Sequence, residues 1–184
     1  MVADQRAGEE KADAGGEAQS AGQAVPMIRS AFADTAFWAP SLTTDANGEA
    51  EIEFTTPDNL TGWKIMTWAM GHGTKVGQGT AQIVTAKNLL LRLQAPRFFI
   101  EKDEVVLSAN IHNYLKSEKA VEARLELEGG CLEPMQAAVQ KVSIPAGGEQ
   151  RVDWRVKVVK AGEAVVRMKA LTDEESDAIE MKFP

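Results

Sequence analysis

The chain has 184 residues, of which 44% are hydrophobic, and its formal net charge at pH 7 is -7. This length allows one ordinary domain or two small ones, each with an apolar core. The acidic balance argues against nucleic acid and an anionic membrane surface as partners, because both bind basic faces, and no apolar run approaches the length of a membrane span.

The first part of the chain, residues 1–26, has the composition of a flexible tail. It is rich in alanine, glycine, glutamate and glutamine and contains no aromatic residue, so it cannot bury enough apolar area to offset the entropy lost on ordering. Arg6 and Lys11 would therefore be accessible to trypsin-like proteases. No signal peptide follows Met1, which fits either a cytosolic protein or a piece cut from a longer exported chain.

Residues 27–86 predict about four strands, which is too few for a complete two-layer domain. The predicted strands are residues 35–42, 49–54, 63–70 and 76–84. In the second, Ile52 and Phe54 alternate with glutamates, which is typical of a half-buried strand. Asn47-Gly48 before it favours a tight hairpin turn. The third strand is apolar on both faces, which favours a central place in a sheet. Half of this domain is therefore missing, or the next domain covers it.

Residues 87–184 predict a complete domain. Apolar and polar residues alternate in about seven segments separated by turn signals, which is the size and rhythm of an immunoglobulin-like sandwich. The segments lie at residues 89–93, 105–111, 121–127, 139–144, 152–158, 166–170 and 179–183. Trp154 shares the register of Val152 and Val156, which predicts a core position. The sequence thus predicts an all-β protein with immunoglobulin-like β-sandwich domains in tandem, the first of them incomplete.

Four phrases that occur in a fixed order resemble a known family. They are Phe32 to Trp38 (Phe-Ala-Asp-Thr-Ala-Phe-Trp), Asp45 to Ala50 (Asp-Ala-Asn-Gly-Glu-Ala), Thr56 to Lys64 (Thr-Pro-Asp-Asn-Leu-Thr-Gly-Trp-Lys), and Pro96 to Phe99 with the strand that ends in Asn113-Tyr114-Leu115. Together they are similar to the α2-macroglobulin family of protease traps, and to its bacterial members in particular. The resemblance spans residues 27–183.

The resemblance implies a fold, a position and a function. In that family, macroglobulin-type sandwiches follow one another along a long exported chain, and a protease that cuts a flexible bait segment is trapped when the scaffold collapses. Residues 1–26 would be the end of the bait, residues 27–86 the following part of one macroglobulin-like domain, and residues 87–184 the complete next domain. The expected function is structural. Its partners would be proteases and the neighbouring domains of a longer parent protein, in the periplasm or outside the cell.

The family's reactive thioester motif, Gly-Cys-Gly-Glu-Gln, is absent from this sequence. Gly130-Cys131-Leu132-Glu133-Pro134 has the cysteine but no glutamine. Gly148-Glu149-Gln150 has the glutamine but no cysteine. Neither segment can close the thioester ring. We therefore expect no catalytic residue, no cofactor and no metal in this chain.

The two histidines and the single cysteine leave a third class of function, a small thiol enzyme, with little support. His72 stands between glycines in a predicted exposed turn, and His112 lies on the polar face of a predicted strand, so a metal site would lack ligands. No feature orients a base toward Cys131 or activates its thiol. The simpler interpretation of Cys131 is a small apolar residue at a strand end.

The four tryptophans favour another alternative, a tandem immunoglobulin-like module that binds a carbohydrate or a protein ligand. Trp68 lies on the opposite strand face from Trp63, so one of the two is expected to be exposed or covered by a neighbouring domain. We take Trp68 as the candidate interdomain contact. In the binding-module alternative, the same side chain would belong to an exposed aromatic patch.

Overall fold

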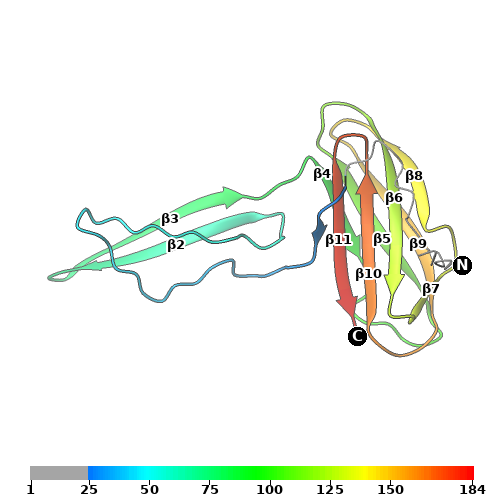
Figure 1. Cartoon of the computed structure of the whole chain (residues 1–184), viewed down its shortest axis with the longest axis horizontal. Coiled ribbons are helices and arrows are strands. Elements are labelled where there is room, and N and C mark those ends of the chain that lie inside the picture. Colours follow the sequence, from blue (N-terminus) through cyan, green and yellow to red (C-terminus); the bar gives the residue numbers. More distant parts are fainter. Residues whose placement is uncertain (1–24) are drawn as a thin grey trace, which may run out of the picture.

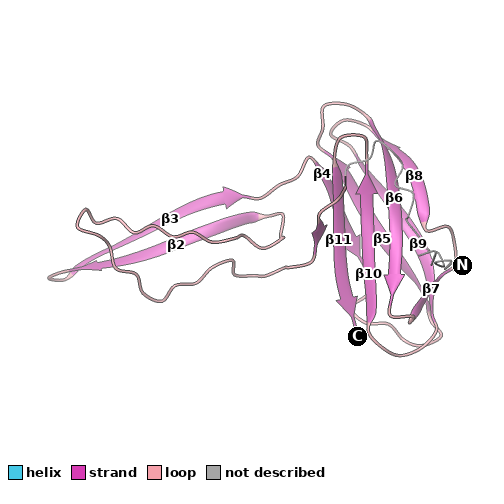
Figure 2. Ribbon diagram, viewed as in Figure 1, coloured by secondary structure: helices cyan, strands magenta, loops and turns pink. Residues whose placement is uncertain are grey.

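The structure is a computed structural model that describes residues 25–184. These residues form eleven β-strands and no helix. The strands build a β-sandwich and a two-stranded ribbon that projects away from it (Figures 1 and 2). The predicted all-β architecture is confirmed. We call residues 32–85, which contain the ribbon, the ribbon unit.

Two sheets make up the sandwich. The first has the order β1-β11-β10-β6-β8, formed by β1 (Ile28–Arg29), β11 (Ser176–Phe183), β10 (Ala164–Leu171), β6 (Lys119–Glu128) and β8 (Val139–Ile144). The second has the order β4-β5-β9-β7, formed by β4 (Leu89–Gln94), β5 (Glu104–Asn113), β9 (Glu149–Val158) and β7 (Leu132–Pro134). Neighbouring strands are antiparallel except β1 and β11, which are parallel. Each segment predicted after residue 87 corresponds to one of these strands, whereas β1 and β7 are too short to give a periodic signal.

The core lies between the two sheets because each strand turns alternate apolar side chains inward. In β9, Trp154 is fully buried between Val152 and Val156. Its Nε1 donates to the backbone carbonyl oxygen of Ala138 at 3.2 Å, so the one polar atom of the indole is satisfied. The prediction that Trp154 is a core residue is confirmed.

The outer face of the first sheet carries charged side chains that link three strands. Arg167 of β10 donates to Glu180 of β11 at 2.9 Å. It also donates to Glu126 and Glu128 of β6, at 3.0 Å each. These hydrogen bonds, the one to Glu180 above all, raise the pKa of Arg167. Because the network lies at the surface, it contributes to strand register more than to stability.

The ribbon pairs β2 (Gly62–Gly71) with β3 (Lys75–Val84) in antiparallel register. Gly73 and Thr74 close its turn with φ values of 69° and 59°. Both strands are therefore present as predicted. The predicted central place of residues 63–70 is wrong for this chain, because within the described residues β2 has β3 as its one neighbour and its other edge is free.

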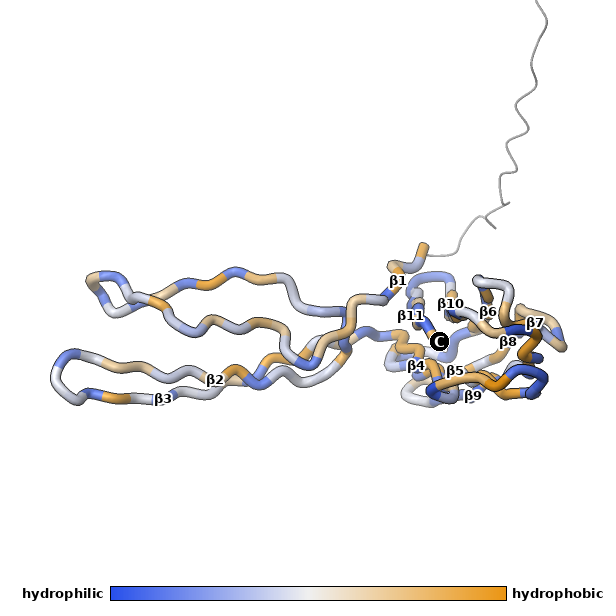
Figure 3. Tube along the Cα trace, turned by 90° about the horizontal axis from the view of Figure 1, so that it is seen from below, coloured by the Kyte–Doolittle hydropathy of each residue, from blue (hydrophilic) through white to orange (hydrophobic). Residues whose placement is uncertain are grey.

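Residues 35–42 and 49–54 run beside the ribbon as extended loops and not as the predicted strands. They form a second layer along it (Figure 3). The predicted turn between them is present, since Asp45 N donates to Glu49 O at 2.8 Å and Gly48 has a φ of 83°. A strand needs a continuous backbone ladder with a neighbour. In the described part of the chain, backbone bonds join these two segments at the turn alone.

Candidate functional site

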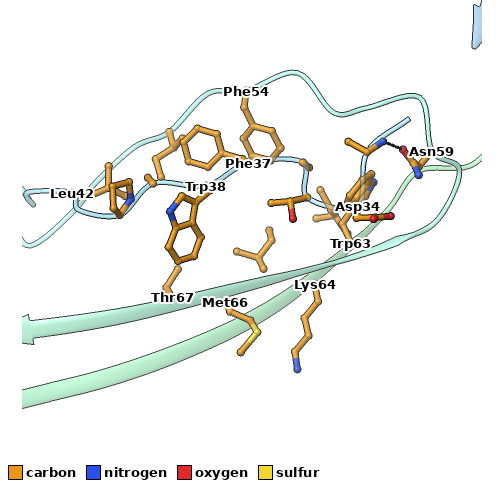
Figure 4. Close-up of a pocket in the computed structure, with 18 of the residues that line it drawn as sticks. Asp34, Phe37, Trp38, Leu42, Phe54, Asn59, Trp63, Lys64, Met66 and Thr67 are labelled. Atoms are coloured by element: carbon orange, nitrogen blue, oxygen red, sulfur yellow. Dashed lines mark hydrogen bonds between the residues drawn. The ribbon is translucent and has the colours of Figure 1, made fainter. Parts of the chain in front are cut away.

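An apolar groove lies between the second layer and β2. Its volume is about 860 Å³, and its apolar lining includes Phe37, Trp38, Leu42, Ile52, Phe54, Trp63 and Ile65. The rings of Phe37 and Phe54 stack with their centroids 5.2 Å apart. Figure 4 shows these rings in the second layer and the Trp38 ring reaching across toward Thr67 of β2.

The groove has the character of an unfilled core. Phe37, Phe54 and Ile65 keep 42%, 38% and 37% of their surface exposed, whereas the core side chains of the sandwich keep almost none. At its rim, Asn59 Oδ1 is already hydrogen-bonded, because it accepts from the backbone N–H of Ala33 at 2.9 Å (Figure 4). Apolar surface of this kind requires another layer to cover it.

The opposite face of the ribbon carries exposed apolar side chains of β2 beside polar side chains of both strands. Strand alternation directs the side chains of Met66, Trp68 and Met70 to the side of β2 away from the groove, and Figure 4 shows Met66 pointing away from it, while Met66 and Trp68 also border the groove. Trp68 is 62% exposed and Met70 is 87% exposed. Trp63, on the groove side, is half-buried and donates from Nε1 to Thr85 Oγ1 at 3.1 Å. The candidate contact residue Trp68 is thus exposed between Met66 and Met70 on the outer face of β2, opposite Gln78 of β3.

Asp58 holds the chain where it enters the ribbon unit. Its Oδ2 accepts hydrogen bonds from the backbone N–H groups of Ser30 at 2.9 Å and Ala31 at 2.8 Å. The backbone N–H of Asp58 donates to the carbonyl oxygen of Ala31 at 2.8 Å. The bonds from Ala31 and Ser30 lower the pKa of Asp58, because they stabilise its carboxylate. The phrase at residues 56–64 therefore fastens the segment that precedes Phe32.

The phrase Asn113-Tyr114-Leu115 has a structural role at one corner of the sandwich. Asn113 is fully buried at the end of β5. Its Nδ2 donates to the carbonyl oxygens of Ser117 at 2.9 Å and Ile144 at 3.0 Å, and its Oδ1 accepts from the Leu115 N–H at 3.0 Å. Because β5 and β8 belong to different sheets, this amide ties the two layers together.

A buried ion pair that sequence reasoning missed lies where the ribbon unit meets the sandwich. Arg29 is 6% exposed and Asp177 is fully buried, and Nη2 of the arginine is 2.7 Å from Oδ2 of the aspartate. The two residues are far apart in sequence, so no spacing could reveal the pair. One sequence signal pointed to a buried charge: Asp177 directly precedes the apolar residues Ala178 and Ile179 in the same strand.

The remaining predicted candidates do not assemble into a reactive site. The Sγ of Cys131 is buried and lies 3.5 Å from each of two carbonyl oxygens, those of Gly129 and Glu163, either of which can accept its one hydrogen. His112 pairs through Nδ1 with Glu149 at 3.0 Å, and His72 is exposed in the ribbon turn.

Two absences complete the description of residues 25–184. No group of three or more histidine, cysteine, aspartate or glutamate side chains in this part could hold a metal ion. None of its segments is a helix of the length and apolarity needed to cross a membrane. Arg6 and Lys11 lie outside the described residues.

These features define an all-β protein built from macroglobulin-type domains. The model of the alpha-2-macroglobulin family matches residues 35–125, from the second layer of the ribbon unit to β6 of the sandwich. Over this range the chain is similar to the alpha-2-macroglobulin family. The resemblance drawn from its sequence phrases is confirmed.

Curated relatives are much longer than this chain. It is 27% identical over 158 residues to an alpha-2-macroglobulin of Thermotoga maritima, which covers 85% of this chain and 10% of the relative. It is 33% identical over 94 residues to an alpha-2-macroglobulin homolog of Nostoc, covering 51% of this chain and 5% of the relative. The chain thus spans a tenth or less of the length of these relatives.

Solved structures share the fold. Trypsin-activated alpha-2-macroglobulin from Escherichia coli superposes with a TM-score of 0.68 at 17% identity, covering 77% of this chain and 10% of the other. The same protein activated by porcine elastase gives a TM-score of 0.68 at 16% identity, covering 84% and 15%. Salmonella alpha-2-macroglobulin reacted with methylamine gives 0.64 at 18% identity, covering 79% and 10%.

Proposed function

We propose that this chain is a structural, non-catalytic part of a bacterial alpha-2-macroglobulin-like protease trap. Residues 1–26 are the end of its bait segment, residues 27–86 the part of a macroglobulin-like domain that follows the bait, and residues 87–184 the complete next domain. The parent protein works outside the cytoplasm, in the periplasm or the extracellular space. Proteases are the proposed partners because two of the solved structures with this fold are of an alpha-2-macroglobulin that a protease has activated.

The open groove is the observation that carries the proposal. A ribbon with apolar side chains on both faces cannot be a finished domain, because exposed apolar area of this extent is covered in stable proteins. β2 is the strand that can pair with a further strand, since it has apolar side chains on both faces and one free edge. β3 contains Gly77, Gly79 and Gln78 in its middle, which suits an edge strand better.

The completing layer comes from the part of the parent protein that precedes the bait. Strands from that part pair with the free edge of β2 and fill the groove over Phe37 and Ile65. The extended segments 35–42 and 49–54 then gain neighbours and become the strands that their alternation predicts. Trp68, on the outer face of the ribbon, contacts an adjoining domain of the parent protein.

A binding module is the second candidate, because Trp38 and Trp68 are 72% and 62% exposed. Sugars stack on exposed tryptophan rings, so a carbohydrate ligand would suit these side chains. The two functions are distinguished by a glycan array. Binding that is lost in Trp68→Ala favours the module, whereas a protease trap gives no glycan signal.

The trap is tested in the parent protein with trypsin at a ratio near one to one. We expect early cuts after Arg6 or Lys11, identified by mass spectrometry, and residues 27–184 left uncut. Trypsin should then lose activity on a large protein substrate while its activity on a small chromogenic peptide persists, because a trapped protease excludes only large molecules.

The matched variants are a double change, Arg6→Gln with Lys11→Gln, and a control, Lys116→Gln in a sandwich loop. The double variant should lose the cuts in the tail, and the control should keep them. Undiminished hydrolysis of the large substrate by trypsin, or first cuts among the strands after Asn88, would rule out the proposed function.

A further inference from the structure

Two connections join the ribbon unit to the sandwich, and both bring a cation to the same carboxylate. The first connection is residues 28–31 and the second is residues 86–88. Arg29 of the first and Lys87 of the second both contact Asp177 of β11. Asp177 is therefore the common anchor of this joint.

The two cations are held in different ways. Arg29 binds the carboxylate with two parallel hydrogen bonds, from Nε to Oδ1 at 2.9 Å and from Nη2 to Oδ2 at 2.7 Å. Lys87 makes one bond, from Nζ to Oδ1 at 3.2 Å, and its side chain is 28% exposed. The backbone N–H of Leu91 completes the set, donating to Oδ2 at 2.9 Å. Since paired guanidinium bonds are the stronger kind, Arg29 is the principal partner of Asp177.

β1 depends on the side chain of Arg29. The strand has two residues, it pairs in parallel with Ala178 and Ile179 at the edge of the sheet, and Ile28 faces outward. A parallel pair of this length supplies few backbone bonds. Met27 just before it is 75% exposed. Arg29 is the buried side chain of this strand, and its Nη2 also donates to the carbonyl oxygen of Leu91 at 2.8 Å.

The same short segment is fastened to the ribbon unit a few residues later. The backbone N–H groups of Ser30 and Ala31 bind Asp58, and that of Ala33 binds Asn59. Residues 29–33 are thus a brace with one end on the sandwich and the other on the ribbon unit. Its position fixes how the two are oriented.

We propose that Arg29 and Asp177 form a latch. With Arg29 in place, the brace and residues 86–88 hold the ribbon unit in one orientation. When Arg29 leaves, β1 separates from β11 and the ribbon unit turns about residues 86–88. The sandwich stays folded in both states.

Lys87 is the reason that the latch can open. A buried carboxylate without a cation is strongly destabilising, but Lys87 stays beside Asp177 and is tied there by a further bond to the carbonyl oxygen of Ser176 at 3.0 Å. The Leu91 N–H stays as well. Asp177 therefore keeps charged and neutral partners when Arg29 departs.

The use of this latch rests on the proposed function. Residues upstream of Ile28 would transmit the state of the bait to Arg29, because they continue directly into β1. A cut in the bait changes the load on β1 without touching the sandwich. The orientation of the ribbon unit relative to the next domain would respond to that cut.

The latch is tested in the full chain by electron–electron distance measurement between two spin labels. One label is attached at His72→Cys in the ribbon turn and the other at Lys141→Cys in β8, where the native side chain is 80% exposed; Cys131 is buried. We expect one narrow distance distribution in the otherwise native chain. In Arg29→Met, which keeps an unbranched apolar stem but removes the guanidinium group and its charge, the width should at least double.

The control is Glu175→Gln, which alters an exposed contact of the second connection with Asn88 and should leave the distribution narrow. If Arg29→Met does not fold, as judged by circular dichroism, Asp58→Ala decides the question. It removes the two side-chain bonds by which Asp58 holds the backbone of Ser30 and Ala31, leaves the buried ion pair intact, and should also double the width. A narrow distribution in whichever of the two variants is folded overturns the latch. A trap assay that fails while the distances respond as expected overturns the proposed function alone.

Discussion

Replacing Trp154 with alanine is expected to lower the free energy of unfolding of the sandwich by about 3–5 kcal/mol. The indole fills the middle of the core with no exposed surface. Its removal leaves a cavity that the surrounding strands close only in part, and the carbonyl oxygen of Ala138 loses one of its two donors while keeping the backbone N–H of Leu125. The loss is measured by urea denaturation, monitored by far-ultraviolet circular dichroism.

The chain supplies a matched control for this substitution. Trp68→Ala removes the same atoms from a side chain that is 62% exposed on the ribbon, and it should change the free energy of unfolding by less than about 0.5 kcal/mol. Equal losses in the two variants would contradict the division into a packed sandwich and an open ribbon unit. So would a larger loss in Trp68→Ala.

Asn113→Ala is expected to destabilise the sandwich by about 2–4 kcal/mol, because each buried partner left unpaired costs about 1–3 kcal/mol. The amide joins the end of β5 to the carbonyl oxygen of Ile144 in β8. It also donates to the carbonyl oxygen of Ser117 and accepts from the N–H of Leu115. Alanine can replace none of these bonds. Thermal unfolding at several urea concentrations gives the free-energy change.

The control is another asparagine of the same strand. Asn110→Ala removes a buried Oδ1 that has no hydrogen-bond partner, so its effect should stay within about 0.5 kcal/mol. A loss in Asn113→Ala no larger than that in Asn110→Ala would show that the corner bonds do not stabilise the sandwich. The phrase Asn113-Tyr114-Leu115 would then need another explanation.

The strands of the sandwich could be predicted because their signal is local. Alternation of apolar and polar residues reports which face of a strand is buried, and turn residues mark where it ends. Trp154 follows this rule within β9. β1 and β7 were not predicted, because alternation over two or three residues carries no information.

The segments 35–42 and 49–54 show the opposite case. Their alternation is real, and the turn at Asn47-Gly48 forms as predicted. A strand also needs a neighbour for its backbone groups, and periodicity cannot say whether that neighbour is in the same chain. The shortage of strands predicted an incomplete layer, and the groove over β2 is its structural counterpart.

The joint could not be predicted from the sequence. Arg29 and Asp177 lie near opposite ends of the chain, and the contact exists only because β1 crosses from the ribbon unit to the edge of β11. An ion pair between residues so far apart in sequence produces no periodic pattern from which it could be predicted. A charged residue inside an apolar strand was the one available signal.

The central claim is that the ribbon unit is one open layer of a domain that the rest of the parent protein completes. Hydrogen–deuterium exchange tests it most directly, by comparing this chain alone with the parent protein. We predict that the β2 amides facing away from β3 exchange rapidly in the isolated chain and slow by at least a hundredfold in the parent protein, while the amides of β5 and β9 exchange equally in both. Rapid exchange of those β2 amides in the parent protein as well would contradict the account.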